Sequence, residues 1–326
     1  MLDDRIKALY LSHAGDDVYD IIRAAAGPDF EVVVLDADDD AERCRKIADC
    51  AAVICAATPL RKEHLDAAAR LQVVHHQGVG WQDTTDWREI RRRGLPLALT
   101  PEGTIVGVAE HTVLLMLAAA KRLTFADAEL RRGHWHVNRL RGASRELCGK
   151  TVGYIGMGRI ARAVAERLKP FGCAGIYCDP NVTLPRAYEY SMGLRSGGFE
   201  ETLGAADILT VHVPLTDATR GLIDRVALAR LKPGAIVVNT ARGGIVDETA
   251  LAEALRSGHV LAAGLDVFET EPPGPDTPLF ALPNVVLTPH ISAGTEDAMQ
   301  EKMRALFDNL RRFFVSGELE NRVTFP

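Results

Sequence analysis

The chain has 326 residues, of which 47% are hydrophobic and 25% are charged, so its composition is that of a globular protein of about two domains. This composition excludes a collagen, a coiled coil and a wholly disordered chain. The formal net charge of −6 argues against a broad surface for nucleic acid or an anionic membrane. A small anionic substrate remains compatible with it, because one buried arginine can bind such a molecule.

Membrane and export signals are weak in this sequence. The strongly apolar run at residues 113–120 is much shorter than the ~20 residues of a membrane-spanning helix. Residues 1–10 are charged and are not followed by the apolar stretch of a signal peptide. The 6 cysteines lack CxxC spacing and predict free thiols in a reducing compartment. We therefore expect a cytoplasmic protein that does not associate with membranes.

Short runs rich in β-branched residues alternate with amphipathic stretches, which is typical of βαβ units and parallel sheets. The first predicted strands cover residues 7–11, 31–36, 53–56, 71–75 and 97–100, with helices at 18–26, 41–48 and 64–69. A second series of predicted strands covers residues 152–155, 176–178, 208–213, 236–239, 264–268 and 285–288. The pattern predicts an α/β fold with two doubly wound parallel-sheet domains.

Two further helices are predicted where the two series meet. Residues 107–123 are apolar nearly all round, so this helix should be buried. Residues 296–314 are amphipathic and are expected to cross back and pack on the first domain. The chain would then pass between the domains near residues 100–105 and 292–295.

A nucleotide-binding motif follows the first strand of the second series. Residues 151–161 read TVGYIGMGRIA and contain G-x-G-x-x-A between a predicted strand and a predicted helix. Gly156 would allow the tight turn, and Gly158 would let a pyrophosphate approach the backbone. The amides of Arg159 and Ile160 would face that phosphate at the start of the helix. The motif predicts a dinucleotide site.

The acidic residue expected in such a site is Asp179, which lies at the end of the next predicted strand, 21 residues after Gly158. Its carboxylate would accept hydrogen bonds from the ribose hydroxyls and repel a 2′-phosphate. The sequence therefore favours NAD over NADP.

Three later strand ends each carry a polar side chain. Arg242, Glu271 and His290 follow successive predicted strands, and Asp266 lies within the predicted strand at residues 264–268. Ligands of open α/β sheets bind at the carboxyl ends of the strands, so the first three residues are expected to converge. A strand-end ion pair, a turn carboxylate and a buried structural histidine are the plainer interpretations of these residues.

Together these segments resemble the D-2-hydroxyacid dehydrogenases. The resemblance covers nearly the whole chain, through the motifs QGVG at 77–80, VAEH at 108–111, the glycine motif, NTARGG at 239–244, DVFETEP at 266–272 and TPH at 288–290. It implies a flavodoxin-like substrate domain, residues 1–104 with 294–326, around a Rossmann NAD-binding domain, residues 105–293. It also implies a homodimer.

The resemblance assigns roles to these residues. Arg242 would hold the carboxylate of a 2-hydroxy or 2-oxo acid and polarise its 2-oxo group. His290 would be the general acid and base, oriented by Glu271. The amides of Val79 and Gly80 would bind the substrate carboxylate. The remaining predicted cofactor contacts are Val213, Thr240, Ala241 and Asp266.

Several positions depart from the family pattern and leave the substrate open. These are His75, His76, Trp81 and Thr104. Trp135 is expected at the surface, or as an alternative in the substrate pocket of a partner subunit. His134 and His136 have ligand-like spacing, but no acid or cysteine cluster accompanies them in the sequence, so no metal is expected. Alternatives to a 2-hydroxyacid dehydrogenase are a non-catalytic NAD(H)-sensing protein and an enzyme that oxidises another small anion.

Overall fold

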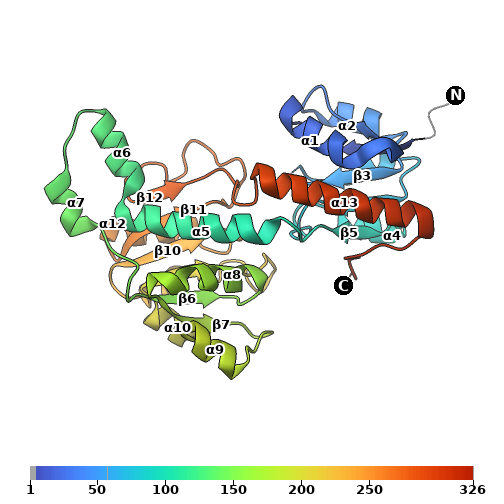
Figure 1. Cartoon of the computed structure of the whole chain (residues 1–326). Helices are drawn as coiled ribbons and strands as arrows, with labels where there is room; N and C mark the ends of the chain where they lie inside the picture. Colours follow the sequence, from blue (N-terminus) through green and yellow to red (C-terminus); the bar gives the residue numbers. More distant parts are fainter. Residues whose placement is uncertain (1–4, 57, 326) are drawn as a thin grey trace. The chain divides into compact units, whose positions relative to one another are not determined.

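The computed structural model describes residues 5–56 and 58–325. Contacts divide the chain into two compact units, one made of Met1–Thr104 and Thr295–Pro326 and the other of Ile105–Gly294. The first unit is therefore discontinuous, and the second is one uninterrupted segment. Figure 1 draws the chain and labels those helices and strands for which there is room.

The first unit is built on a five-stranded parallel sheet with the order β2-β1-β3-β4-β5. Its strands are β1 (Ile6–Tyr10), β2 (Phe30–Val33), β3 (Ala52–Cys55), β4 (Val73–His76) and β5 (Leu97–Leu99). Its helices are α1 (Asp16–Ala26), α2 (Asp40–Ile47), α3 (Lys62–Ala67), α4 (Trp87–Arg92) and α13 (Glu296–Ser316). This strand order is the flavodoxin-like one, as predicted.

The second unit is built on a seven-stranded parallel sheet with the order β12-β11-β10-β9-β6-β7-β8. Its strands are β6 (Thr151–Ile155), β7 (Ala174–Cys178), β8 (Leu194–Ser196), β9 (Ile208–Val211), β10 (Ala235–Asn239), β11 (Val260–Leu265) and β12 (Val285–Leu287). The strand order reverses its direction between β6 and β9. This is the doubly wound Rossmann order, and it confirms the predicted fold class.

The helices of the second unit cover both faces of its sheet. They are α5 (Thr104–Lys121), α6 (Leu123–Arg131), α7 (Val137–Ala143), α8 (Arg159–Leu168), α9 (Arg186–Met192), α10 (Phe199–Ala205), α11 (Arg225–Ala229) and α12 (Glu248–Ser257). One hydrophobic cluster joins α5 and α8 to the sheet, and another packs α10, α11 and α12 against it. A three-layer structure results.

Helix α5 is the one helix among the described residues that is long and apolar enough to cross a membrane, with a mean hydropathy of 1.4 over its 18 residues. Its length and composition would suit a membrane span, and 56% of that window is buried in the structure. Met116 and Ala120 are fully buried in the core cluster that α5 shares with β6. A core helix of a globular protein has the same composition, so this helix is weak evidence for a membrane.

Helix α13, red in Figure 1, packs on the unit that contains the blue N-terminal elements. Met303, Leu306, Phe307 and Leu310 are fully buried and share a cluster with α1 and β1. The buried positions follow helical spacing, which explains why the amphipathic pattern predicted this packing.

The structure differs from the predicted elements at several places, of which three bear on the sheets and the site. Helix α4 and strand β8 were not predicted, and β11 ends at Leu265 rather than extending to residue 268. Strand β8 lies at the edge of the sheet, where Leu194 is its one buried residue, so it lacks the apolar signal of a central strand. Asp266 consequently lies just beyond β11 and not within it.

Candidate active site

The glycine motif forms a tight turn between β6 and α8. Gly156 has a φ of +91°, and a Cβ there would lie 2.7 Å from the backbone oxygen of His212 and 2.9 Å from Val213 Cγ1. Both the backbone conformation and the loop after β9 therefore require glycine. Gly158 caps α8, and a Cβ there would meet no heavy atom of the described residues within 4 Å. The first amides of α8 are thus approachable, as an anion site needs.

Asp179 lies next to this turn because β7 pairs with β6. Its Oδ2 accepts a hydrogen bond of 2.7 Å from the amide of Met157, and its Oδ1 accepts one of 2.8 Å from the amide of Asn181. These bonds fix the carboxylate at the edge of the glycine turn. A carboxylate has about four acceptor positions, so two remain for ribose hydroxyls. The residues that are present therefore fit NAD.

The loop after β10 carries Thr240, Ala241 and Arg242. Asn239 braces it, since its Oδ1 accepts from the Ala241 amide at 3.0 Å and its Nδ2 donates to the Arg242 carbonyl at 2.8 Å. Thr240 is buried, with its hydroxyl 2.8 Å from that of Thr112 on α5. Arg242 Nη1 donates to the Ala241 carbonyl at 2.8 Å. The arginine is held close to the strand end from which it emerges.

Glu271 and His290 are hydrogen-bonded to each other, with 2.7 Å between Oε2 and Nδ1. They follow the neighbouring strands β11 and β12, and both side chains are 36% exposed. Burial opposes ionisation of Glu271, but hydrogen bonds from His290 and the Phe268 amide, with the charge of Arg242, outweigh it and lower its pKa. The predicted pairing of these two residues is present in the structure.

His290 has a left-handed backbone with a φ of +53°, which is unusual for a residue other than glycine. Its amide donates to the Asp266 carbonyl at 2.8 Å. The fully buried carboxylate of Asp266 accepts from the Thr288 hydroxyl at 2.6 Å and from the amides of Ile291 and Ser292 at 2.9 Å. Asp266 thus holds the loop that positions His290, and its predicted cofactor contact stays a prediction.

Val79 and Gly80 belong to the first unit, in the loop after β4. Val79 is 38% exposed, and the Gly80 carbonyl accepts from the Thr84 hydroxyl at 3.1 Å. Gln77 anchors the start of the loop, because its Oε1 accepts from Tyr10 and its Nε2 points to Met299 Sδ. The side chain of Val79 therefore faces solvent while the loop itself is fixed to the unit.

The unusual residues near this loop have structural partners. His75 is buried against Asn309 of α13, and burial lowers its pKa to about 3. His76 lies 2.8 Å from the Thr84 hydroxyl. Trp81 packs edge-on against Trp87 and Phe325. These contacts explain the residues as parts of the unit's core, whereas Trp135 in the second unit is 78% exposed.

Two contributors to the site were missed in the sequence. Asn239 braces the Arg242 loop, and a Cβ at Gly243 would lie only 1.8 Å from the Phe268 carbonyl oxygen. Gly243 therefore allows the loops after β10 and β11 to approach each other. The sequence did offer a signal for each of them: Asn239 is a polar residue at the end of a buried strand, and Gly243 directly follows the arginine.

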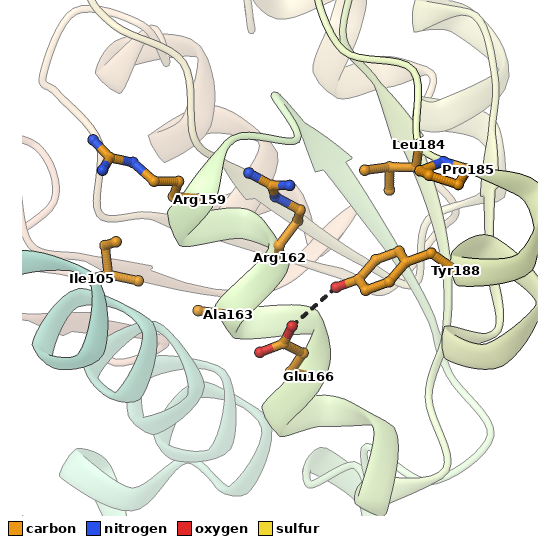
Figure 2. A pocket seen from close by; sticks show the side chains of 8 residues that line it. All are labelled: Ile105, Arg159, Arg162, Ala163, Glu166, Leu184, Pro185 and Tyr188. Carbon is orange, nitrogen blue, oxygen red and sulfur yellow. Dashed lines mark hydrogen bonds between the residues drawn. The ribbon is translucent and has the colours of Figure 1, made fainter.

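A hollow of about 480 Å³ lies beside α8, away from the paired Glu271 and His290. Figure 2 shows Arg159, Arg162 and Glu166 on α8 and Tyr188 on α9, with the Tyr188 hydroxyl bonded to Glu166. Arg159 is the predicted cofactor-binding residue that lines it. The hollow therefore borders the predicted pyrophosphate position without including the acid–base pair.

The glycine turn follows β6, where the strand order of the Rossmann sheet reverses, and Asp179 follows the neighbouring strand β7; this arrangement defines an NAD-binding domain. Residues 113–292 match the family described as D-isomer specific 2-hydroxyacid dehydrogenase, NAD binding domain. The chain belongs to this family, and NAD is its cofactor.

Known relatives agree with this assignment. The D-3-phosphoglycerate dehydrogenase of Mycobacterium leprae (strain TN) is 43% identical over 289 residues, which are 88% of this chain and 54% of that protein. The glyoxylate reductase of Korarchaeum cryptofilum (strain OPF8) is 37% identical over 82% of this chain and 81% of its own length. A crystal structure of a Thermus thermophilus protein has a TM-score of 0.84 and 34% identity, covering 98% of this chain and all of that one. The chain spans about half the length of the phosphoglycerate dehydrogenases that it matches.

Proposed function

We propose that the protein interconverts a D-2-hydroxy acid and its 2-oxo acid with NAD as hydride carrier. The observation that carries this proposal is the hydrogen bond between His290 Nδ1 and Glu271 Oε2, placed beyond the same sheet that carries the glycine turn. A histidine oriented by a carboxylate is the arrangement that general acid–base catalysis needs.

The cofactor would be held by residues around the glycine turn. Gly156, Gly158 and the amides of Arg159 and Ile160 would receive its pyrophosphate, and Asp179 would bind its ribose. Val213, Thr240, Ala241 and Asp266 complete the proposed cofactor-binding set. NAD supplies the hydride chemistry when bound.

His290 would move the proton. Its Nδ1 is engaged by Glu271, so Nε2 is the nitrogen left to give a proton to the 2-oxo group in reduction and to remove it in oxidation. Glu271 keeps the ring oriented. Its own lowered pKa keeps it ionised at neutral pH, as this role requires.

Arg242 would bind the substrate through its carboxylate. A guanidinium is permanently charged and forked, so it can pair with a carboxylate and also polarise the adjacent carbonyl oxygen. The backbone amides of Val79 and Gly80 in the first unit are proposed to bind the same carboxylate. The substrate is thus a small anionic 2-hydroxy or 2-oxo acid, and its side chain is left to experiment.

The test is NADH consumption with a panel of 2-oxo acids that includes glyoxylate, and NAD reduction with 3-phosphoglycerate. We expect turnover with at least one member. Arg242→Ala should raise KM and lower kcat with little change in NADH affinity, and Arg242→Lys should restore little activity. The matched control is Arg256→Ala, since Arg256 contacts the Pro278 carbonyl at the surface.

The outcomes separate the alternatives. NADH binding without turnover on any substrate would favour the NAD(H)-sensing protein, and turnover with a small anion outside the 2-oxo acids would favour the other oxidoreductase. Normal turnover in Arg242→Ala would show that another cation binds the substrate.

We also propose that the protein is a cytoplasmic homodimer. The exposed apolar side chains of Leu123, Leu130, Trp135 and Val137 on and between α6 and α7 support a surface for a second copy. Sedimentation velocity at micromolar concentration measures the mass, and a monomer at all concentrations would contradict the dimer.

A further inference from the structure

Every residue of helices α6 and α7 is at least partly exposed, as is every residue of α9 in the same unit. Neither helix has a buried apolar face within the chain, so hydrogen bonds of the turn between them are what join the two helices there. That turn, residues 132–136, contains His134 and His136 on either side of Trp135.

The turn is shaped by its backbone. Gly133 has a φ of +83°, and the amide of His134 donates to the Glu129 carbonyl at 2.9 Å, which reverses the chain at the end of α6. This reversal brings His134 Nδ1 to 2.9 Å from Glu129 Oε2. His136 Nε2 lies 2.8 Å from the same oxygen. Two imidazoles and one carboxylate therefore point to a common centre.

The ring of His136 is positioned by packing as well. It stacks on Phe125 with 5.8 Å between the ring centres and 23° between the ring planes. The other carboxylate oxygen of Glu129, Oε1, accepts from Arg132 Nη1 at 2.9 Å. The arginine fixes the carboxylate from one side and leaves Oε2 to the two histidines.

We propose that Glu129, His134 and His136 form a binding site for a divalent transition-metal ion, with Zn²⁺ as the best-suited occupant. The three ligand atoms lie within 4.8 Å of one another. Zinc bound to two imidazole nitrogens and a carboxylate oxygen at about 2.0–2.1 Å places these atoms roughly 3.3 Å apart. The two histidine–carboxylate separations, 2.9 and 2.8 Å, would widen by about half an ångström, and a fourth position stays open for water or another ligand.

The site reverses the expectation of no metal, whose premise was that no acid accompanies the two histidines. The acid is Glu129, which lies on the helix before them and meets them only because of the turn at Gly133. A second cluster, Asp40 with Glu63 and His64, is less suitable. There two arginines, Arg43 and Arg61, occupy both oxygens of the Asp40 carboxylate, whereas Arg132 occupies only the Glu129 oxygen that does not contact the histidines.

Binding would join α6 to α7 through the metal and so fix a segment that has little core of its own. It also places Trp135, 78% exposed, between two of the ligands. The other two tryptophans, Trp81 and Trp87, are packed in the first unit. A change in the emission of Trp135 is therefore a local signal of occupancy.

The experiment uses the whole 326-residue chain without a polyhistidine tag, freed of metal by a chelator. Zn²⁺ is titrated at pH 7.5 against a chromogenic competitor. We expect saturable binding of one ion per chain, complete at or below 100 µM Zn²⁺. Glu129→Gln and His136→Ala should each weaken binding at least tenfold. His13→Ala and Cys148→Ser, which alter an exposed histidine and the exposed free cysteine, should leave it unchanged.

The emission of Trp135 gives the second readout. Zn²⁺ should change the fluorescence of the wild type and not of Glu129→Gln, and Trp135→Phe should lose the signal while keeping the ion. Unchanged thermal unfolding and NADH binding of the metal-free variants show that the fold is intact. Absence of stoichiometric binding at 100 µM Zn²⁺, or equal affinity in wild type and Glu129→Gln, would overturn the proposal.

Discussion

The buried carboxylate of Asp266 allows a sharp test of how the His290 loop is held. Asp266→Asn keeps the size of the side chain but replaces one acceptor oxygen with an NH₂ group. The Oδ1 atom accepts from Thr288 and Ile291, and Oδ2 accepts from Ser292. Whichever way the amide turns, at least one donor faces another donor.

The better orientation keeps the amide oxygen at the Oδ1 position and leaves the buried amide of Ser292 without an acceptor. A hydrogen bond to a charged group contributes about 1.5–3 kcal/mol, and an unsatisfied buried group costs about 1–3 kcal/mol. The two free energies are not simply added, because losing the bond is what leaves the Ser292 amide unsatisfied. We expect the free energy of unfolding to fall by about 2–4 kcal/mol. The loop that carries His290 should loosen too, lowering kcat at least tenfold.

Equilibrium unfolding in urea, without cofactor, measures the first effect and steady-state kinetics the second. Asp224→Asn is the matched control, because Asp224 caps α11 through one bond to the Ala227 amide and asparagine is an equally good cap. If Asp266→Asn is as stable as this control, the carboxylate is not the anchor of the loop and the reasoning fails.

Three further predictions concern charge. In Glu271→Gln the alkaline limb of the reduction rate should move to lower pH. In the wild type the pKa of Glu271 is lowered, so this carboxylate should stabilise the fold fully above about pH 4.3 and lose that stabilisation on acidification. If the pH–rate profiles of the wild type and Glu271→Gln coincide, Glu271 is not part of the acid–base pair. For Asp179, wild-type kcat/KM should favour NADH over NADPH at least tenfold, and Asp179→Asn should narrow that ratio; equal efficiency in the wild type would refute the assignment. Burial lowers the pKa of His75 to about 3, so below about pH 6.5 the unfolded chain takes up a proton that the folded chain does not. The free energy of unfolding should therefore decrease as the pH is lowered from about 6.5, by up to about 1.4 kcal/mol per pH unit. His75→Gln should flatten this slope in acid unfolding, and an unchanged slope would contradict it.

Much of the fold could be predicted because central strands such as β9 and β10 are short, continuous apolar runs. Strand β8 could not, because it has one buried residue, and the bounds of β11 were wrong because its alanines carry little strand signal. A strand is recognised in a sequence by a run of buried β-branched residues. Edge strands and alanine-rich strands contain few such residues, so the sequence pattern does not mark them.

The candidate site divides in the same way. The glycine turn depends on residues adjacent in sequence, so its motif predicted it directly. The hydrogen bonds of Asp266 to residues 288–292 form only because the loop after β12 lies against the end of β11. Glu129 meets the two histidines only because the turn after α6 reverses the chain. Residue types alone do not predict either path of the backbone. Asp266 was expected to contact the cofactor, and its structural use became visible only with the neighbouring loop in place.

The return of α13 to the first unit has a consequence for biosynthesis. Residues 105–294 form one compact unit from an uninterrupted segment, so they can fold as soon as they leave the ribosome. The sheet of the first unit is made earlier, yet Met303, Phe307 and Leu310 are needed to close its core against α1. The part translated first is thus completed last, and until then its apolar surface stays open to chaperones.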